Sequence, residues 1–237
     1  VYFSVSNFSV THPTTLVALS HNWPSPPWYS YSDGDDGSDW IRINTSARTL
    51  SNGMGYTHQF VKPLAYIAFS VPYVPSKQRR QLLNDLQNSS NKGMTAIPVL
   101  VTTSEANNAV LAINISSTAA RNSVDGSNPQ KTLVWLQARQ HAWESGSSWV
   151  ADGVARYAAS LAGSALLKVA DVVINPIMDV DNVVVGGDGK DQEPVDFNRD
   201  WCPLGQISRN ETKAKCQCWA AISATIAKIQ HAMASGG

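Results

Sequence analysis

The sequence predicts a small all-β domain of the sandwich type over residues 1–75, followed over residues 76–237 by an α/β domain with flanking helices. Two observations predict this division. Short alternating or apolar runs separated by turn-forming residues fill the first part, and no helical period appears there. From Pro75 onward, apolar runs of strand length alternate with helical segments, which is typical of an α/β sheet.

The composition indicates a folded domain. Of the 237 residues, 43% are hydrophobic and only 15% are charged, and Lys plus Arg equals Asp plus Glu at 18 each. This balance excludes a basic nucleic-acid-binding surface as the main theme, and the hydrophobic content excludes disorder. Charged residues interrupt the richest apolar window, residues 154–174. We therefore expect no membrane span.

Apolar runs predict the strands of both parts. In the first part, residues 1–10 alternate, residues 40–45 form a short run, and residues 64–71 are almost continuously apolar. In the second part, buried strands are expected over residues 96–101, 109–115, 132–138 and 171–177.

Three segments of the second part predict helices. The first begins near Ser76 and ends before Asn88–Gly93. The second covers residues 147–162, with Ser147 or Ser148 as its cap. Its apolar residues share one face, which we expect to be the buried one: Val150, Val154, Tyr157, Ala158 and Leu161. The third covers about residues 212–234 and stops at Gly236.

Cysteines and glycosylation sequons favour an extracellular or periplasmic protein. Cys202 could form a disulfide with either Cys216 or Cys218, closing a short loop. The Cys216-Gln-Cys218 pair could alternatively bind a metal, although no second pair matches it. Asn-x-Ser/Thr sequons, which are acceptor sites for N-glycans, occur at Asn7, Asn44, Asn88, Asn114 and Asn210.

His141 and Glu144 stand three residues apart, directly after the strand predicted over residues 132–138. Ligands bind at the carboxyl ends of strands in α/β sheets. Imidazole nitrogen and carboxylate oxygen both suit zinc, and a catalytic zinc ion usually takes three protein ligands and a water. The alternative is structural, with His141 capping the following helix and Glu144 solvated in its first turn.

A second motif extends this pattern. It consists of Pro176-Ile-Met-Asp-Val-Asp-Asn-Val183 and, further on, Asp196-Phe-Asn-Arg-Asp-Trp201. Together with the His-x-x-Glu segment it resembles the zinc metallocarboxypeptidase family, most closely the cytosolic-carboxypeptidase-like and bacterial branches. In that family a strand ends in an A-R-x-H-P-G-E motif. A helix follows, and after it come the motifs P-M-x-N-P-D-G-V and D-L-N-R-x-W.

The resemblance covers nearly the whole chain. Ser70-Val-Pro-Tyr-Val74 is similar to the P-Y-T-Y segment that opens the catalytic domain in this branch. The branch also carries an N-terminal β-sandwich. The resemblance therefore implies a carboxypeptidase-like mixed sheet with flanking helices, preceded by the all-β domain.

The family also implies roles for individual residues. His141 and Glu144 correspond to the first two zinc ligands, and Asn198 and Arg199 to the pair that binds the terminal carboxylate of a peptide or protein substrate. A guanidinium group suits that role because its rigid fork of donors binds a carboxylate in bidentate fashion. Alternatively, Arg199 forms a structural ion pair with Asp196 or Asp200.

This sequence departs from the family at four places. Asp179-Val-Asp-Asn182 replaces the family's N-P-D-G segment. Trp143 stands where relatives have Gly, and the family's carbonyl-polarising Arg aligns with Gly189, so that Lys190 next to it is the available positive charge. The family's third zinc ligand and its general base come later than Gly237, so we expect the chain to be an incomplete portion of a hydrolase and inactive alone. His231 reads as part of a helix face and is a poor candidate for the third ligand.

Two further expectations concern the remaining residues. His12, His21 and His58 fall in the predicted sandwich, where we expect surface or structural roles. The missing Arg, the altered N-P-D-G segment and the sequons also allow a different function. In that alternative, the chain is a glycosylated extracellular structural or binding module that keeps the fold without catalysis.

Overall fold

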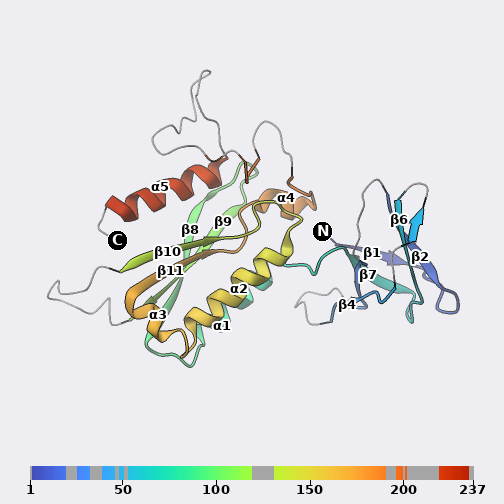
Figure 1. Ribbon diagram of the computed structural model, residues 1–237, viewed down its shortest axis with the longest axis horizontal. Coiled ribbons are helices and arrows are strands. Elements are labelled where there is room, and N and C mark those ends of the chain that lie inside the picture. The colour runs from blue at the N-terminus through green and yellow to red at the C-terminus, as the bar shows by residue number, and fades with distance from the viewer. Residues whose placement is uncertain are drawn as a thin grey trace, which may run out of the picture. The chain divides into compact units, whose positions relative to one another are not determined.

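The computed structural model describes residues 2–19, 26–32, 39–45, 48–50, 53–118, 131–190, 196–199, 201 and 219–234. The chain divides into two compact units, residues 1–77 and 78–237. Figure 1 labels their helices and strands. Among the described residues, no helix is both long enough and apolar enough to cross a bilayer.

The first unit contains two antiparallel sheets. One has the strand order β1 (Tyr2–Ser6), β7 (Leu64–Ala68), β3 (Trp28–Ser30), β4 (Ile41–Arg42), and the other has the order β2 (Thr14–Leu19), β6 (Gly53–His58), β5 (Arg48–Leu50). Their shared core consists of Phe8, Tyr29, Ile43, Phe60, Ala65 and Ile67. Val5 of β1 and Leu16 of β2 both pack against this core. Since these two strands belong to different sheets, the unit is a two-sheet sandwich.

The second unit is built on a four-stranded mixed sheet. Its strand order is β10 (Thr132–Gln137), β11 (Ala170–Asn175), β9 (Ala109–Ser117), β8 (Met94–Thr103). β10 and β11 run parallel, whereas the β11–β9 and β9–β8 pairs are antiparallel. Helices connect the parallel pair, as such a crossover requires. The sheet and its helices confirm the predicted fold class, an α/β mixed sheet preceded by a small all-β domain.

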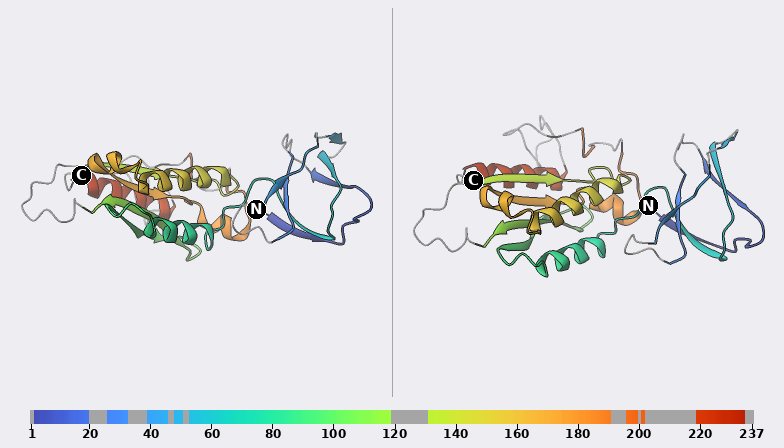
Figure 2. Two further views of the ribbon diagram at one scale, coloured as in Figure 1. Left: turned by 90° about the horizontal axis from the view of Figure 1, so that it is seen from below. Right: turned by 60° about the horizontal axis from the view of Figure 1, so that its bottom comes forward.

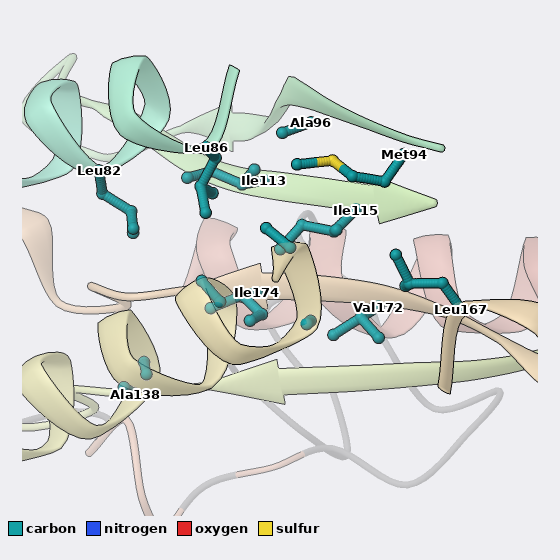
Figure 3. Close-up of a cluster of buried hydrophobic side chains, with 14 residues drawn as sticks. Leu82, Leu86, Met94, Ala96, Ile113, Ile115, Ala138, Leu167, Val172 and Ile174 are labelled. Atoms are coloured by element: carbon teal, nitrogen blue, oxygen red, sulfur yellow. The ribbon is translucent and has the colours of Figure 1, made fainter. Parts of the chain in front are cut away.

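Helices cover both faces of this sheet. α1 (Gln78–Gln87), α2 (Ser145–Ala159) and α3 (Ser164–Val169) share a hydrophobic core with one face, which includes Leu86, Ile113, Leu167 and Ile174. α5 (Ala220–Ala234) contacts β8 and contributes no residue to that core. In Figure 3, α2 lies in front of the strands and α5 lies behind them. Figure 2 gives two further views of these elements.

Four of the five apolar residues predicted to share the buried face of α2 are instead exposed, and one of them, Leu161, lies after the end of the helix, whereas Ala158 is buried as predicted. Val150 is 66% exposed, Tyr157 55% and Leu161 68%. The buried side of α2 carries small residues: Ser148, Ala151, Asp152, Ala155, Ala158 and Ala159. Small side chains let the axis of α2 come close to the sheet and to α1. The buried face of α2 is therefore the one that carries alanine, and the largest apolar residues face away from the core.

The predicted caps and bounds of the helices also need correction. The N-cap of α2 is Glu144, and neither Ser147 nor Ser148 has that position. Ser148 Oγ donates instead to the carbonyl oxygen of Pro176 at 2.7 Å. The short helices α3 and α4 (Val180–Val185) were not expected. Of the last predicted helix, residues 220–234 form α5, and residues 212–218 lie outside the described residues.

The turn of the β8–β9 hairpin, residues 104–108, anchors two helices. Glu105 Oε1 accepts the N–H of Ala220, the first residue of α5, at 2.7 Å. Asp181 in the first turn of α4 accepts hydrogen bonds from the Ser104 hydroxyl, the Ala106 N–H and the Asn108 amide. Carboxylates therefore join this one turn to the amino-terminal ends of both helices, where negative charge is stabilising.

Candidate metal centre

The candidate site follows the carboxyl ends of the parallel strands β10 and β11. Backbone hydrogen bonds continue past the strand ends: Ala138 N–H donates to Asn175 O, Met178 N–H to Ala138 O, and Asp179 N–H to Arg139 O, at 2.9–3.1 Å. The loop after β10 is therefore fixed to the loop after β11. His141 and Glu144 lie on this loop, at the edge of the sheet where α/β proteins bind ligands.

The side chains of His141 and Glu144 meet. Nδ1 of His141 lies 3.0 Å from Oε1 of Glu144. The imidazole is only 2% exposed, whereas the carboxylate is 43% exposed, so the pair is open to solvent on the Glu144 side. Zinc binds nitrogen at about 2.0–2.1 Å and carboxylate oxygen at about 2.0–2.2 Å, so two atoms bound to one tetrahedral ion lie about 3.4 Å apart, a few tenths of an ångström more than in this pair. The donor atoms of this pair fit two positions of a zinc site.

Asp196 holds the other nitrogen of the same imidazole. Its Oδ1 lies 3.0 Å from Nε2 of His141, and the carboxylate is 6% exposed. A carboxylate bonded to the distal nitrogen fixes the ring orientation of a metal-binding histidine and makes its free nitrogen more basic. Such a bond leaves Nδ1 as the nitrogen available to a metal.

The two carboxylates also change the protonation of His141. Burial lowers the pKa of the imidazole, but the hydrogen bonds to Glu144 and Asp196 and the charges of both carboxylates outweigh burial, so the pKa is raised above 6.5. The carboxylates thus attract either a proton or another cation to this imidazole.

Asn198 and Arg199 lie on a turn attached to the His141 loop. Gln140 Nε2 donates to the carbonyl oxygen of Phe197 at 3.0 Å, and Asn198 N–H donates to Oδ1 of Asp196 at 2.7 Å. Arg199 is exposed, and its Nη1 donates to the Asn198 carbonyl oxygen at 3.2 Å. Arg199 forms no ion pair with Asp196, while Asp200, its other possible partner, lies outside the described residues. The structure therefore brings the turn that bears Asn198 and Arg199 next to His141.

Trp143, which precedes Glu144 in the chain, contacts Lys190. The backbone N–H of Trp143 donates to the carbonyl oxygen of Asp188 at 3.0 Å. This bond joins residues 186–190 to the start of α2. Lys190 Nζ lies over the indole ring, 5.8 Å from its centroid. Gly189, aligned with the family's Arg, has a φ of 73°. An exposed cation therefore lies beside the residue that precedes Glu144.

Among the described residues, no group of three or more His, Cys, Asp or Glu side chains is arranged to hold a metal ion. His231 is an exposed residue of α5, His12 is exposed beside Ser9 and Thr11, and His58 packs in the core of the sandwich. His21 and the three cysteines lie outside the described residues.

Sequence reasoning missed the bond between Asp196 and His141. Asp196 was considered only as a partner for Arg199, because 55 residues separate it from the histidine. The available signal was an Asp two residues before the Asn-Arg pair, in a turn with apolar Phe197. Burial of that carboxylate beside His141 is a consequence of the tertiary fold and has no local signature.

Three solved structures resemble this chain over almost its whole length. They are a carboxypeptidase A of Shewanella denitrificans described as putative (TM-score 0.72, 17% identity, 98% of this chain), a metallo-carboxypeptidase of Burkholderia cenocepacia (0.71, 18%, 97%) and one of Pseudomonas aeruginosa in complex with (2-guanidinoethylmercapto)succinic acid (0.71, 17%, 100%). The chain spans 57% of the length of each of them. No protein-family model matches it, and neither does any curated protein. On structural similarity, the chain has the metallo-carboxypeptidase fold, preceded by a small all-β domain.

Proposed function

We propose that this chain provides the substrate-anchoring part and two metal ligands of a zinc-dependent carboxypeptidase, which removes residues from the C-termini of peptides or proteins. One observation carries the proposal: the two nitrogens of one buried imidazole are bonded to Glu144 and to Asp196. The same Asp196 holds the turn that bears Asn198 and Arg199. A metal position and an anchor for a carboxylate are thus joined through a single side chain.

In this proposal His141 and Glu144 hold zinc, which when bound supplies a Lewis acid and a water of lowered pKa. Asp196 keeps the imidazole oriented with Nδ1 toward the ion. Arg199 and Asn198 bind the terminal carboxylate of the substrate, and the guanidinium is free of a carboxylate partner among the described residues. Lys190, held over Trp143, adds a positive charge near the site.

A catalytic zinc usually has three protein ligands. The described residues bring two together. We therefore propose that the peptidase activity needs a third ligand and a general base in addition to this pair. The bacterial structures that this chain resembles are named carboxypeptidases and metallo-carboxypeptidases, which supports this proposal.

The alternative is an extracellular or periplasmic binding module without catalysis. Three sequon asparagines, Asn7, Asn44 and Asn88, are exposed and could carry glycans. Asn114 lies on β9 and is half-buried, and Asn210 lies outside the described residues. The replacement at Gly189 also removes a side chain that the family uses for catalysis. These features favour the module only if the metal site proves empty in solution.

Metal analysis of the purified protein tests the proposal. We expect one zinc ion per protein containing the third ligand, and loss of that zinc in His141→Ala and Glu144→Ala. Arg156→Ala is the matched control, because Arg156 binds Asp152 and Asp85 away from the site. A protein with normal folding and no zinc at equimolar supply contradicts the proposal and supports the module.

Activity on paired substrates tests the carboxylate anchor. We expect cleavage of a peptide with a free C-terminus and none of its C-terminal amide. Arg199→Gln should raise KM by about 10–100-fold, as expected for loss of a charged hydrogen bond worth about 1.5–3 kcal/mol. Equal hydrolysis of the acid and the amide would assign the metal site to another reaction.

A further inference from the structure

Arg139 has an unusual backbone conformation for its residue type. Its φ is 55°, and the other described non-glycine residues with positive φ are Asn7 and Asn107. Asparagine tolerates the left-handed region because its short side chain bonds locally, whereas arginine has no such compensation. Conformations of this kind persist where the surrounding contacts hold them in place, and they concentrate at functional sites.

The side chain of Arg139 is also unusually placed. It is a cationic residue only 4% exposed, and burial of a guanidinium is costly unless it is hydrogen-bonded. Its Nε donates to the carbonyl oxygen of Ala142 at 2.7 Å. Ala142 directly follows His141, so the guanidinium is bonded to the backbone inside the His-x-x-Glu segment.

The main chain of Arg139 is bonded to the other end of that segment. Its N–H donates to Oγ of Ser147 at 2.9 Å, and the same hydroxyl donates to the carbonyl oxygen of Glu144 at 2.7 Å. Its carbonyl oxygen accepts the N–H of Asp179, which attaches it to the loop after β11. Arg139 is thus bonded to Ala142 next to His141, to Ser147, whose hydroxyl is bonded to Glu144, and to Asp179 in the loop after β11.

We propose that Arg139 is a positioning residue for the metal pair: it holds the backbone between His141 and Glu144 so that their ligand atoms stay about 3 Å apart. The inference rests on the proposed zinc site. Two ligands on a loop bind a metal well only when their geometry is fixed to within about 0.5 Å by supporting contacts. Loss of such supporting residues typically weakens metal binding by about 10–100-fold.

The test compares metal affinity with the stability of the metal-free protein. The variants are R139Q, which removes the charge and the guanidinium donors, and R139K, which keeps a positive charge but lacks the Nε–H donor that bonds to the Ala142 carbonyl oxygen. R156K is the matched control, because Arg156 also uses its guanidinium for hydrogen bonds, to the carboxylates of Asp152 on α2 and Asp85 on α1, but lies away from the site. The dissociation constant for Zn²⁺ is measured by competition with a chromophoric chelator, and that for Co²⁺ by its visible absorption, on the full-length protein.

A positioning role predicts weaker Zn²⁺ binding in R139Q and R139K by about 10-fold or more, with a changed Co²⁺ absorption band and no change in R156K. A merely structural role predicts a lower urea midpoint of the metal-free variants, while the folded variants bind Zn²⁺ as tightly as the wild type. That second result overturns the inference and leaves the zinc site intact. Absence of metal binding in the wild type overturns the zinc site and this inference together. R139K decides the question if R139Q does not fold.

Discussion

Oδ1 of Asp196 lies 3.0 Å from Nε2 of His141, and the same oxygen accepts the N–H of Asn198 at 2.7 Å. One carboxylate oxygen therefore connects the imidazole of the candidate metal site to the turn that presents Arg199. The two halves of the proposed chemistry, metal binding and carboxylate anchoring, share a single buried atom.

Replacement of Asp196 by Asn should weaken zinc binding by about 10–100-fold, because the histidine loses the partner that orients it and makes it more basic. Asp171→Asn is the control, since Asp171 pairs with Lys131 at the opposite end of β11. Titration with Zn²⁺ against a chelator measures both. Unchanged affinity in Asp196→Asn would separate the carboxylate from metal binding.

The protonation of His141 should follow the raised pKa. The pKa of His141 is expected above 6.5 in the metal-free protein, and Asp196→Asn should lower it, as followed by NMR of the ring. Because the folded-state pKa is raised, the stabilisation by protonated His141 is complete below pH 6.5 and is lost as the pH rises through the folded-state pKa. Zinc binding requires the neutral ring, so its affinity should decrease as the pH falls below that pKa. A His141 pKa below 6.5 would refute this assignment.

His58 should make the sandwich sensitive to acid. It packs against the rings of Tyr29 and Phe60, with centroids 4.6 and 4.7 Å away, and its Nε2 is buried with no hydrogen-bond partner among the described residues. Burial lowers the pKa of His58 below 6.5, so the unfolded chain binds the proton more readily and stability falls as the pH drops below 6.5. His58→Phe should remove that part of the acid dependence, as measured by urea unfolding at pH 7.5 and 5.0. His12→Phe, at an exposed position, should leave it in place.

Substitutions on the two sides of α2 should differ sharply. Val150→Gln and Leu161→Gln, at positions 66% and 68% exposed, should change the free energy of unfolding by less than about 0.5 kcal/mol. Ala155→Leu, at a fully buried position, should destabilise by about 1–3 kcal/mol because no space is available. Chemical denaturation of the three variants checks this. A large loss in Val150→Gln would place the apolar stripe in an interface.

Gly153, inside α2, and Gly163, the N-cap of α3, form a matched pair. A Cβ at Gly163 would lie 2.2 Å from the carbonyl oxygen of Tyr157 and 2.6 Å from that of Ala158, so Gly163→Ala should cost about 1–3 kcal/mol. A Cβ at Gly153 would meet nothing within 4 Å, so Gly153→Ala should stabilise the helix by about 0.5–1 kcal/mol. Thermal unfolding should move the midpoints of the two variants in opposite directions.

The fold class and the positions of most second-unit elements followed from periodicity, because runs such as residues 109–115 and 171–177 are apolar enough to identify buried strands. The orientation of α2 did not. Its largest apolar residues indicated one face, but the close approach of the helix selected the face of Ala151, Ala155 and Ala159. Periodicity gives the type of an element, while packing distance decides which face is buried.

The sequence predicted the metal pair of the candidate site but not the contacts that support it. The spacing of His141 and Glu144 after a strand indicated a metal pair, and their side chains do meet. The bond to Asp196 spans 55 residues, and the left-handed backbone of Arg139 depends on contacts with Ala142 and Ser147. Neither feature has a sequence signature, because each results from the way separate loops close on one another.

The shared anchor of α4 and α5 has a consequence for how the second unit opens. Glu105 and Asp181 tie both helices to the turn at residues 104–108, although the two helices are far apart along the chain. Opening of this hairpin turn would release both helix ends in one event. Their amide protons should therefore exchange with deuterated solvent as one cooperative group, with a common opening free energy, rather than as two independent fraying segments.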